Sequence, residues 1–171
     1  MNSQDIADLL RPTVQAGRDD AATAACVGAL LSACRPTASL LTPAQRLGAP
    51  DKAAGHLLHA ETDLSLLAIV WRPGQRTRIH DHRCWCVVHV LEGSERETQY
   101  EDHGDFLTEP ITTRNAEGSV SALAPPGDLH RIHNDTDRVT ISLHVYGIDL
   151  RVAGSSARRT YDAPVRTLAR H

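Results

Sequence analysis

The stretch that decides the fold reads Gly74-Gln-Arg-Thr-Arg-Ile-His80-Asp-His82. In a β-strand, residues i and i+2 project to the same face, so His80 and His82 point together while Asp81 points the other way. Two imidazoles side by side on one strand form half of a metal site. A lone His-x-His pair in a half-exposed strand is more often a surface feature than a metal site, so a further ligand is needed before the pair can be assigned to a metal site.

A second stretch supplies that candidate, because Pro125-Pro-Gly-Asp-Leu-His130-Arg-Ile-His133-Asn134 combines a Pro-x-Gly turn with a nearby histidine. The turn would bring His130 to the same point as the first pair. Three neutral histidines that leave open positions suit Fe(II), Zn(II), Cu(II) or Ni(II). The chain also contains ten histidines against three tyrosines, two tryptophans and one phenylalanine, which favours metal chemistry or proton transfer.

The surrounding sequence indicates an all-β domain with a helical N-terminal region. Short runs rich in Val, Ile and Leu alternate with turn residues, which is typical of a sandwich or barrel. The strands predicted from these runs are Leu64–Trp71, Arg78–His82, Trp85–Leu91, Ser119–Leu123 and Arg138–Tyr146. The helices predicted before them are a segment ending at Pro12, a segment from Ala21 to Cys34 with Asp19 or Asp20 as its N-cap, and a turn at Pro43–Leu47. We therefore expect one domain over 1–171, with a helical region at 1–50 and a barrel at 55–162.

Composition excludes several classes of protein. The 18 basic and 21 acidic residues give a net charge of -3, which does not predict a nucleic-acid partner. The longest apolar runs, such as Leu64–Trp71, are far shorter than the ~18 residues of a membrane span. Met1–Leu10 has no basic n-region of a secretory signal, so we expect a cytoplasmic protein, either monomer or homodimer. The four cysteines form no Cys-x-x-Cys pair and are expected to be free thiols.

In two places the chain resembles the cupins. The matching positions are Gly74, His80, His82 and Gly93 for one motif, and Pro125, Gly127, His130 and Asn134 for the other. This resemblance implies a small cupin (jelly-roll) barrel with the helical region as an N-terminal cap. The general cupin pattern also has a metal-binding glutamate three or four residues after the second histidine, where this chain has Cys86 and Val87. The missing carboxylate favours a site of three histidines.

One branch of the cupins has such a site, namely the thiol dioxygenases. The motifs Ile79–His82, Leu129–Asn134 and Ser142–Gly147 resemble cysteine dioxygenase and its mercaptopropionate-oxidising relatives, over about Gly55 to Tyr161. The resemblance implies that His80, His82 and His130 bind Fe(II). It also implies that O2 and a small thiol, either cysteine-like or a mercapto-acid, are converted to a sulfinate.

The segment after residue 139 alternates polar and apolar residues, with Ser142, His144 and Tyr146 on one face. By itself this pattern fits an ordinary amphipathic strand with its polar face in water. The resemblance implies instead an inward-facing relay, in which Ser142 orients His144 and His144 holds the Tyr146 hydroxyl. It also places Cys86 where eukaryotic members form a thioether with the active-site tyrosine, so we expect a Cys86–Tyr146 crosslink. The other readings of Cys86 are a small buried cysteine and a thiolate ligand.

The residue that binds the substrate is less defined. Family members carry an arginine or glutamine on an early strand to hold the substrate carboxylate, and the matching position here is Gly55. The remaining candidates are Arg78, Arg158, Arg159 and His56, each of which is otherwise a solvated charge. Two alternative functions therefore stay open: a cupin oxygenase of specialised metabolism that forms a product other than the simple sulfinate, and a non-catalytic cupin that binds a metal or a small acid.

Overall fold

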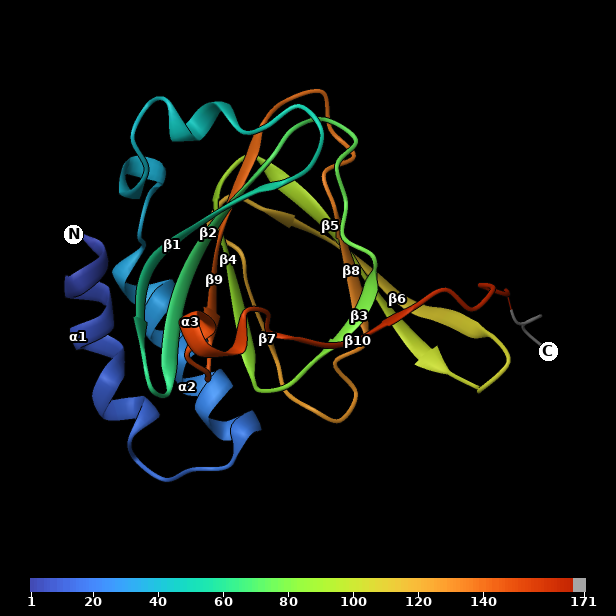
Figure 1. Cartoon of the computed structure of the whole chain (residues 1–171), viewed down its shortest axis with the longest axis horizontal. Coiled ribbons are helices and arrows are strands. Elements are labelled where there is room, and N and C mark those ends of the chain that lie inside the picture. The colour runs from blue at the N-terminus through green and yellow to red at the C-terminus, as the bar shows by residue number, and fades with distance from the viewer. Residues whose placement is uncertain (168–171) are drawn as a thin grey trace.

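Two five-stranded antiparallel sheets face each other and make up most of the molecule (Figure 1). The structure is a computed structural model, and it describes residues 1–167. The first sheet has the order β1-β2-β9-β4-β7 and the second has the order β10-β3-β8-β5-β6. The strands are β1 Ala54–Glu61, β2 Leu64–Trp71, β3 Ile79–His82, β4 Cys86–Glu92, β5 Ser94–Asp102, β6 Leu107–Ala116, β7 Val120–Leu123, β8 His130–His133, β9 Thr140–Tyr146 and β10 Ala157–Tyr161. This is the predicted jelly-roll arrangement.

The helices precede the sheets in the chain and cover one of them. They are α1 Ser3–Val14 and α2 Asp20–Cys34, followed by the short η1 Ala38–Leu40 and η2 Gln45–Leu47, while α3 Leu150–Ala153 lies between β9 and β10. The side chain of Asp19 accepts a hydrogen bond from the backbone N–H of Ala22 and so begins α2, as predicted. The prediction that α1 ends at Pro12 is wrong. Pro12 lies in the last turn, where it removes only one backbone hydrogen bond, and the helix continues to Val14.

The main apolar core lies between these helices and the outer face of the first sheet (Figure 1). The helices contribute Leu10 and Leu31, and β9 contributes Ile141, Leu143 and Val145, all of them fully buried. Because side chains alternate along a strand, burying this face of β9 under the helices turns Ser142, His144 and Tyr146 toward the second sheet. The location of the core therefore determines which side chains reach the interior.

A single glycine lets the chain pass from the first sheet to the second. Gly93 lies between β4 and β5 with a φ of +81°, where a side chain is strained. A Cβ atom there would lie 2.8 Å from Thr140 Oγ1 and 3.0 Å from the backbone oxygen of Val139. Glycine is therefore required for β5 to turn away from β9 and pair with β8, the strand that carries His130.

The five predicted strands are present, each within two residues of its expected bounds. The strands β1, β5, β6, β8 and β10 lack a clear hydrophobic alternation and were not predicted. Within residues 1–167, no helix has the length and apolar character needed to cross a bilayer.

Candidate metal centre

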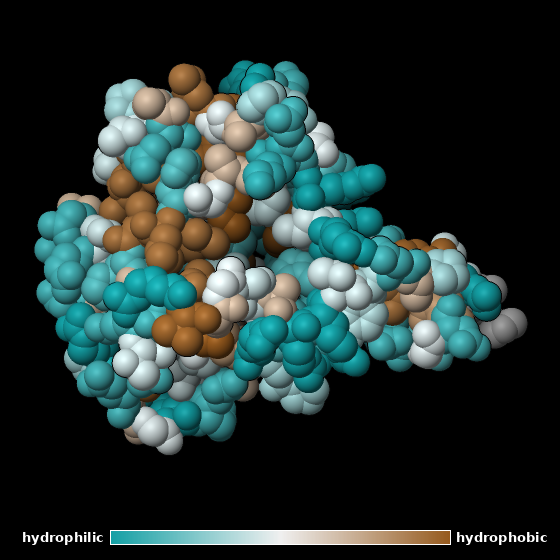
Figure 2. Space-filling model, in the orientation of Figure 1, coloured by the Kyte–Doolittle hydropathy of each residue, from teal (hydrophilic) through white to brown (hydrophobic). Residues whose placement is uncertain are grey.

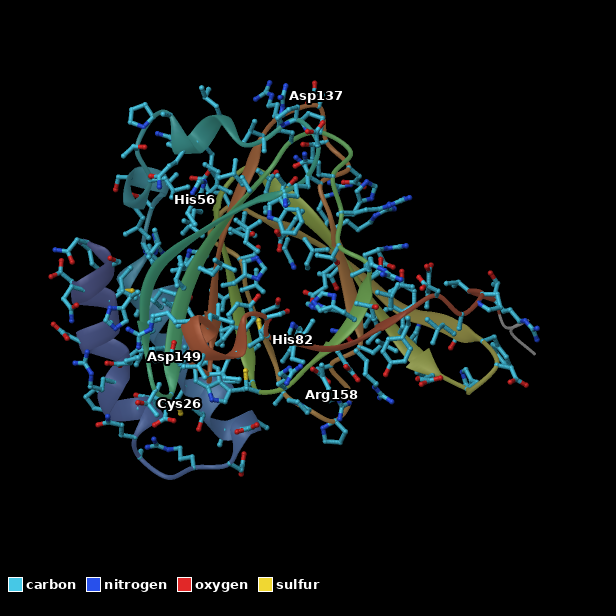
Figure 3. The ribbon with its side chains drawn as sticks, in the orientation of Figure 1. Cys26, His56, His82, Asp137, Asp149 and Arg158 are labelled. Atoms are coloured by element: carbon cyan, nitrogen blue, oxygen red, sulfur yellow. The ribbon has the colours of Figure 1, made fainter. Side chains whose placement is uncertain are left out.

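Three histidines from two neighbouring strands meet in the space between the sheets. His80 and His82 lie on β3, and His130 begins β8 directly opposite His80. The three ring centroids are 4.8 to 5.0 Å apart, and one nitrogen of each ring lies within 4.8 Å of the others. Figure 3 shows His82 between the two sheets. The structure therefore brings together the two histidine motifs that lie far apart in the sequence.

Hydrogen bonds fix the orientation of all three rings. The Nδ1–H of His80 donates to the backbone oxygen of Arg78 at 3.0 Å. The Nδ1–H of His82 donates to Asp128 at 3.0 Å, and that of His130 donates to Glu97 at 2.8 Å. Each bond uses the Nδ1 atom as donor, so each Nε2 atom carries a free lone pair. Partners of this kind hold histidine ligands in the tautomer that binds a metal.

The electrostatic environment keeps His80 and His82 neutral. Burial, reinforced by the neighbouring histidines, lowers the pKa of His80 to about 3 and that of His82 to about 4. Burial opposes ionisation of Glu97, but the hydrogen bonds from His130, Ser121 and Asn115 together outweigh it and lower the pKa of this carboxyl. Three imidazoles, two of them backed by carboxylates and one by a backbone oxygen, fit a divalent transition metal. Cys86 is not part of this group, so the structure does not support its reading as a thiolate ligand.

A chain of buried hydrogen bonds runs along the inner face of β9. The indole N–H of Trp71 donates to Ser142 Oγ at 2.9 Å, and Ser142 Oγ lies 3.0 Å from His144 Nε2. His144 Nδ1 lies 3.2 Å from the hydroxyl oxygen of Tyr146. The expected Ser142–His144–Tyr146 arrangement is therefore present as geometry, and Trp71 extends it by one member.

The direction of these bonds follows from what each group can donate. The indole N–H can only donate, so Ser142 Oγ accepts from Trp71, and its hydroxyl proton and second lone pair are available to His144 Nε2. Burial lowers the pKa of His144 to about 3, so the ring is neutral and carries one N–H; in the tautomer with that proton on Nδ1, the ring accepts from Ser142 and donates to the Tyr146 oxygen. Burial also raises the pKa of Tyr146 well above its usual value, which keeps the phenol protonated. The Tyr146 hydroxyl thus retains its proton for a third group.

Tyr146 lies beside both the histidines and Cys86. Its ring centroid is 6.1 Å from that of His82. Cys86 is its direct cross-strand partner in the β4–β9 pair, and both side chains are at most 5% exposed. Side chains directly opposite each other on antiparallel strands are close neighbours. The two groups of the expected crosslink are therefore adjacent.

The structure shows where the four candidates for substrate binding lie. Arg158 and Arg159 both donate to Asp81, at 2.5 and 3.0 Å, on the face of β3 opposite the metal histidines. Although burial opposes it, these hydrogen bonds and one from Tyr161 lower the pKa of Asp81 well below its usual range. These two arginines are held there because β10 pairs with β3, which the sequence did not predict.

The other two candidates also lie elsewhere. Arg78 is 61% exposed and forms an ion pair with Asp162 at the surface. His56 projects from β1 toward Gln45 of η2, well away from His82 (Figure 3). Its ring lies on the outer side of β1 because Gly55 and Leu57 take the inner face.

Sequence reasoning missed several residues that support the centre. Asp128 had a signal, because it is a carboxylate two residues before His130 in the Pro-Pro-Gly motif. Glu97 and Trp71 had none, since their roles depend on the β5–β8 and β2–β9 pairings. Glu95 was also missed, although it alternates with Glu97 on the inner face of β5. It is fully buried, and neither carboxylate oxygen has a hydrogen-bond partner among residues 1–167.

Comparisons with solved structures support the fold. The chain is similar to an uncharacterized conserved protein with a double-stranded β-helix domain from Klebsiella pneumoniae, at 18% identity and a TM-score of 0.50, covering 64% of this chain and 90% of that one. It is also similar to a cupin superfamily protein from Desulfitobacterium hafniense, at 14% identity and a TM-score of 0.51, covering 67% and 89%. Both likenesses show the cupin fold.

Comparison with known sequences goes further. Auxin-binding protein 1 of Arabidopsis thaliana is 33% identical over 81 residues, which are 47% of this chain and 40% of that protein. The chain thus spans less than half the length of that curated relative. The family model for cysteine dioxygenase type I matches residues 2–152 and so covers the helices, the three histidines and the β9 hydrogen-bond chain. The chain belongs to the cysteine dioxygenase type I family.

Proposed function

We propose that this protein is a non-haem iron thiol dioxygenase that adds both atoms of O2 to the sulfur of a small thiol and forms a sulfinate. The observation that carries the proposal is the set of three histidine Nε2 atoms gathered beside a protonated Tyr146 hydroxyl, in a chain of this family. Overall, a thiol and O2 give a sulfinic acid. The S–H proton is released, two S–O bonds form, the O–O bond breaks, sulfur loses four electrons and oxygen gains them.

The iron would be held by His80, His82 and His130. When bound, iron(II) would favour the thiolate form of the substrate and supply the one-electron chemistry that O2 requires. Glu97 and Asp128 would keep two of the ligands oriented, because each accepts a hydrogen bond from a ligand's Nδ1–H. The three histidines add no charge of their own, so the charge of the ion is not offset by its direct ligands.

The chain's own residues then position the reacting groups. Trp71 and Ser142 fix the His144 tautomer, and His144 in turn uses up one lone pair of the Tyr146 oxygen. Tyr146 is left with one hydroxyl proton, which would be donated to substrate or oxygen atoms near the centre. A non-catalytic metal-binding cupin would not need this donor, which is why the β9 chain favours an enzyme.

Oxygen consumption by the iron-loaded protein tests the proposal. The thiol panel contains cysteine, cysteamine, 3-mercaptopropionate, mercaptosuccinate, homocysteine and 3-methylbutane-1-thiol, and products are identified by mass spectrometry. Stoichiometric O2 uptake with a sulfinate product from one of them is the expected result. Uptake without sulfinate would favour an oxygenase with another product, and no uptake with any thiol would contradict the proposal.

A further inference from the structure

An apolar cavity opens between β1, β2 and α3. Its volume is about 270 Å³, and it is lined by Leu57, Leu67, Leu150, Gly154, Ser155 and Ser156. None of these lining residues carries a charge. Figure 2 shows hydrophobic side chains gathered over β1 and β2 at the hollow between the two sheets, with further ones at α3.

This cavity adjoins the histidine centre. Leu67 lies on the inner face of β2, with Leu57 opposite it on β1 and His144 opposite it on β9. Leu67 and Leu150 also pack against the cluster that contains Cys86 and Tyr146. The Tyr146 ring is in turn 6.1 Å from that of His82. The wall is therefore connected to the histidine centre through the residues around Tyr146, and a ligand held at the histidines can extend toward it.

The wall is built to contact an apolar group. Leu57 is 45% exposed although it projects to the inner side of β1, so a ligand that covers it removes apolar surface from water. A carboxylate in the same place would lose its hydration without gaining a counter-ion.

The arginines nearest to the lining residues along the chain are already paired. Arg151 is paired with Asp149 at 2.6 Å, and Arg158 and Arg159 are paired with Asp81. Arg83, whose backbone N–H donates to the backbone oxygen of Ser156, donates its Nε–H to the backbone oxygen of Ala157.

We infer that the substrate presents an uncharged, apolar group to the wall formed by Leu57, Leu67 and Leu150. The chemical class is a short alkyl thiol, in preference to an amino thiol or a mercapto-acid. This inference rests on the proposed function, because it assumes that the substrate's sulfur lies at the three histidines.

Binding of two thiols of matched shape tests the inference. The pair is 3-methylbutane-1-thiol and 3-mercaptopropionate, which differ by an isopropyl group in place of a carboxylate. Their dissociation constants are measured by calorimetry on the iron-loaded protein without oxygen. We expect the alkyl thiol to bind at least about tenfold more tightly. Equal binding, or tighter binding of the acid, overturns the inference.

The two proposals fail in different ways. If the acid is preferred but is oxidised to a sulfinate, only the substrate class is wrong. If the alkyl thiol is preferred but no thiol consumes oxygen, only the proposed reaction is wrong. If neither thiol binds, the substrate class is wrong, and oxygen uptake with the other thiols of the panel decides the proposed reaction.

A substitution of Gly55, which lies next to the wall on β1, provides a second test. Gly55 is on the inner face of β1, and a Cβ atom there would meet only the two δ-carbons of Leu67, at 3.6 and 4.0 Å. Gly55→Arg therefore has room to place a guanidinium group against the wall. We expect it to narrow or remove the preference, with 3-mercaptopropionate binding about tenfold more tightly than in the unmodified protein. Ala29→Arg adds the same charge at an exposed position of α2, away from the sheets' interior, and should leave the ratio unchanged. An unchanged ratio in Gly55→Arg would contradict the assignment of this wall to the substrate.

Discussion

The buried carboxyl group of Glu95 makes the stability of the protein depend on pH. Glu95 is 0% exposed, and both of its oxygens lack a partner among residues 1–167. Burial raises its pKa from 4.5 to about 8, because it outweighs the opposing effect of the nearby Ser142 hydroxyl; the charge of Glu97 adds a smaller upward contribution. The folded protein therefore holds a proton near neutral pH that the unfolded chain has released.

The sign and size of the effect follow from proton linkage. This contribution to the free energy of unfolding is fully present below pH 4.5, falls as the pH rises, and is lost above about pH 8. Each pH unit in that interval is worth about 1.4 kcal/mol, so the whole interval gives an upper limit on the order of 5 kcal/mol. Entry of water on ionisation would reduce the measured value below this limit.

Glu95→Gln tests this reasoning, because glutamine has the shape of the protonated acid and cannot ionise. Urea unfolding of the metal-free protein from pH 5 to pH 8, followed by tryptophan fluorescence, gives the free energies. We expect the two proteins to have similar stability at pH 5, and Glu95→Gln to be the more stable by several kcal/mol at pH 8. Glu101→Gln, at an exposed position of the same strand, is the matched control. Parallel pH profiles for the unmodified protein and Glu95→Gln would refute a protonated, buried carboxyl.

Three further predictions concern the centre. Tyr146→Phe should lower turnover by a factor of about 100 or more and leave the iron content unchanged, because it removes only the donor hydroxyl. The control Tyr100→Phe changes another buried tyrosine and should preserve turnover. After turnover, intact-mass spectrometry should find a chain two hydrogens lighter, and Cys86→Ala should abolish this species; a full-mass chain would exclude the crosslink. Glu97→Gln should weaken iron affinity about 10- to 100-fold, because the ring of His130 loses its charged acceptor. A metal-competition titration measures the affinity, and an unaltered value would show that Glu97 does not support the ligand.

Sequence patterns predicted the parts of the barrel that lie under the helices. The strands β2, β4 and β9 bury one apolar face against α1 and α2, so their sequences are rich in Val, Ile and Leu. The strands β5 and β6 were missed because their side chains face other surroundings. On β5 the inner face carries Glu95 and Glu97, while much of β6 is exposed to solvent. A polar barrel interior thus hides strands from a search for hydrophobic alternation.

The same limit applied to the site. His80, His82 and His130 were predicted because strand alternation and two short motifs define them within a few residues. The positions of Arg158 and Arg159 depend on the pairing of β10 with β3, which places both arginines beside Asp81. Local sequence patterns do not predict such a long-range contact. Glu97 reaches His130 only because Gly93 lets β5 pass to the second sheet.

Iron content per chain is the most direct test of the three-histidine centre. The protein is loaded with Fe(II) without oxygen, desalted, and measured by inductively coupled plasma mass spectrometry. The same measurement is made on His80→Ala, His82→Ala and His130→Ala, and on His89→Ala, which removes a buried histidine that points away from the centre. Circular dichroism checks that each variant is folded.

We predict one iron per chain in the unmodified protein and in His89→Ala, and loss of most of the iron in each of the other three variants. Full iron content in folded His80→Ala, His82→Ala or His130→Ala would contradict the account.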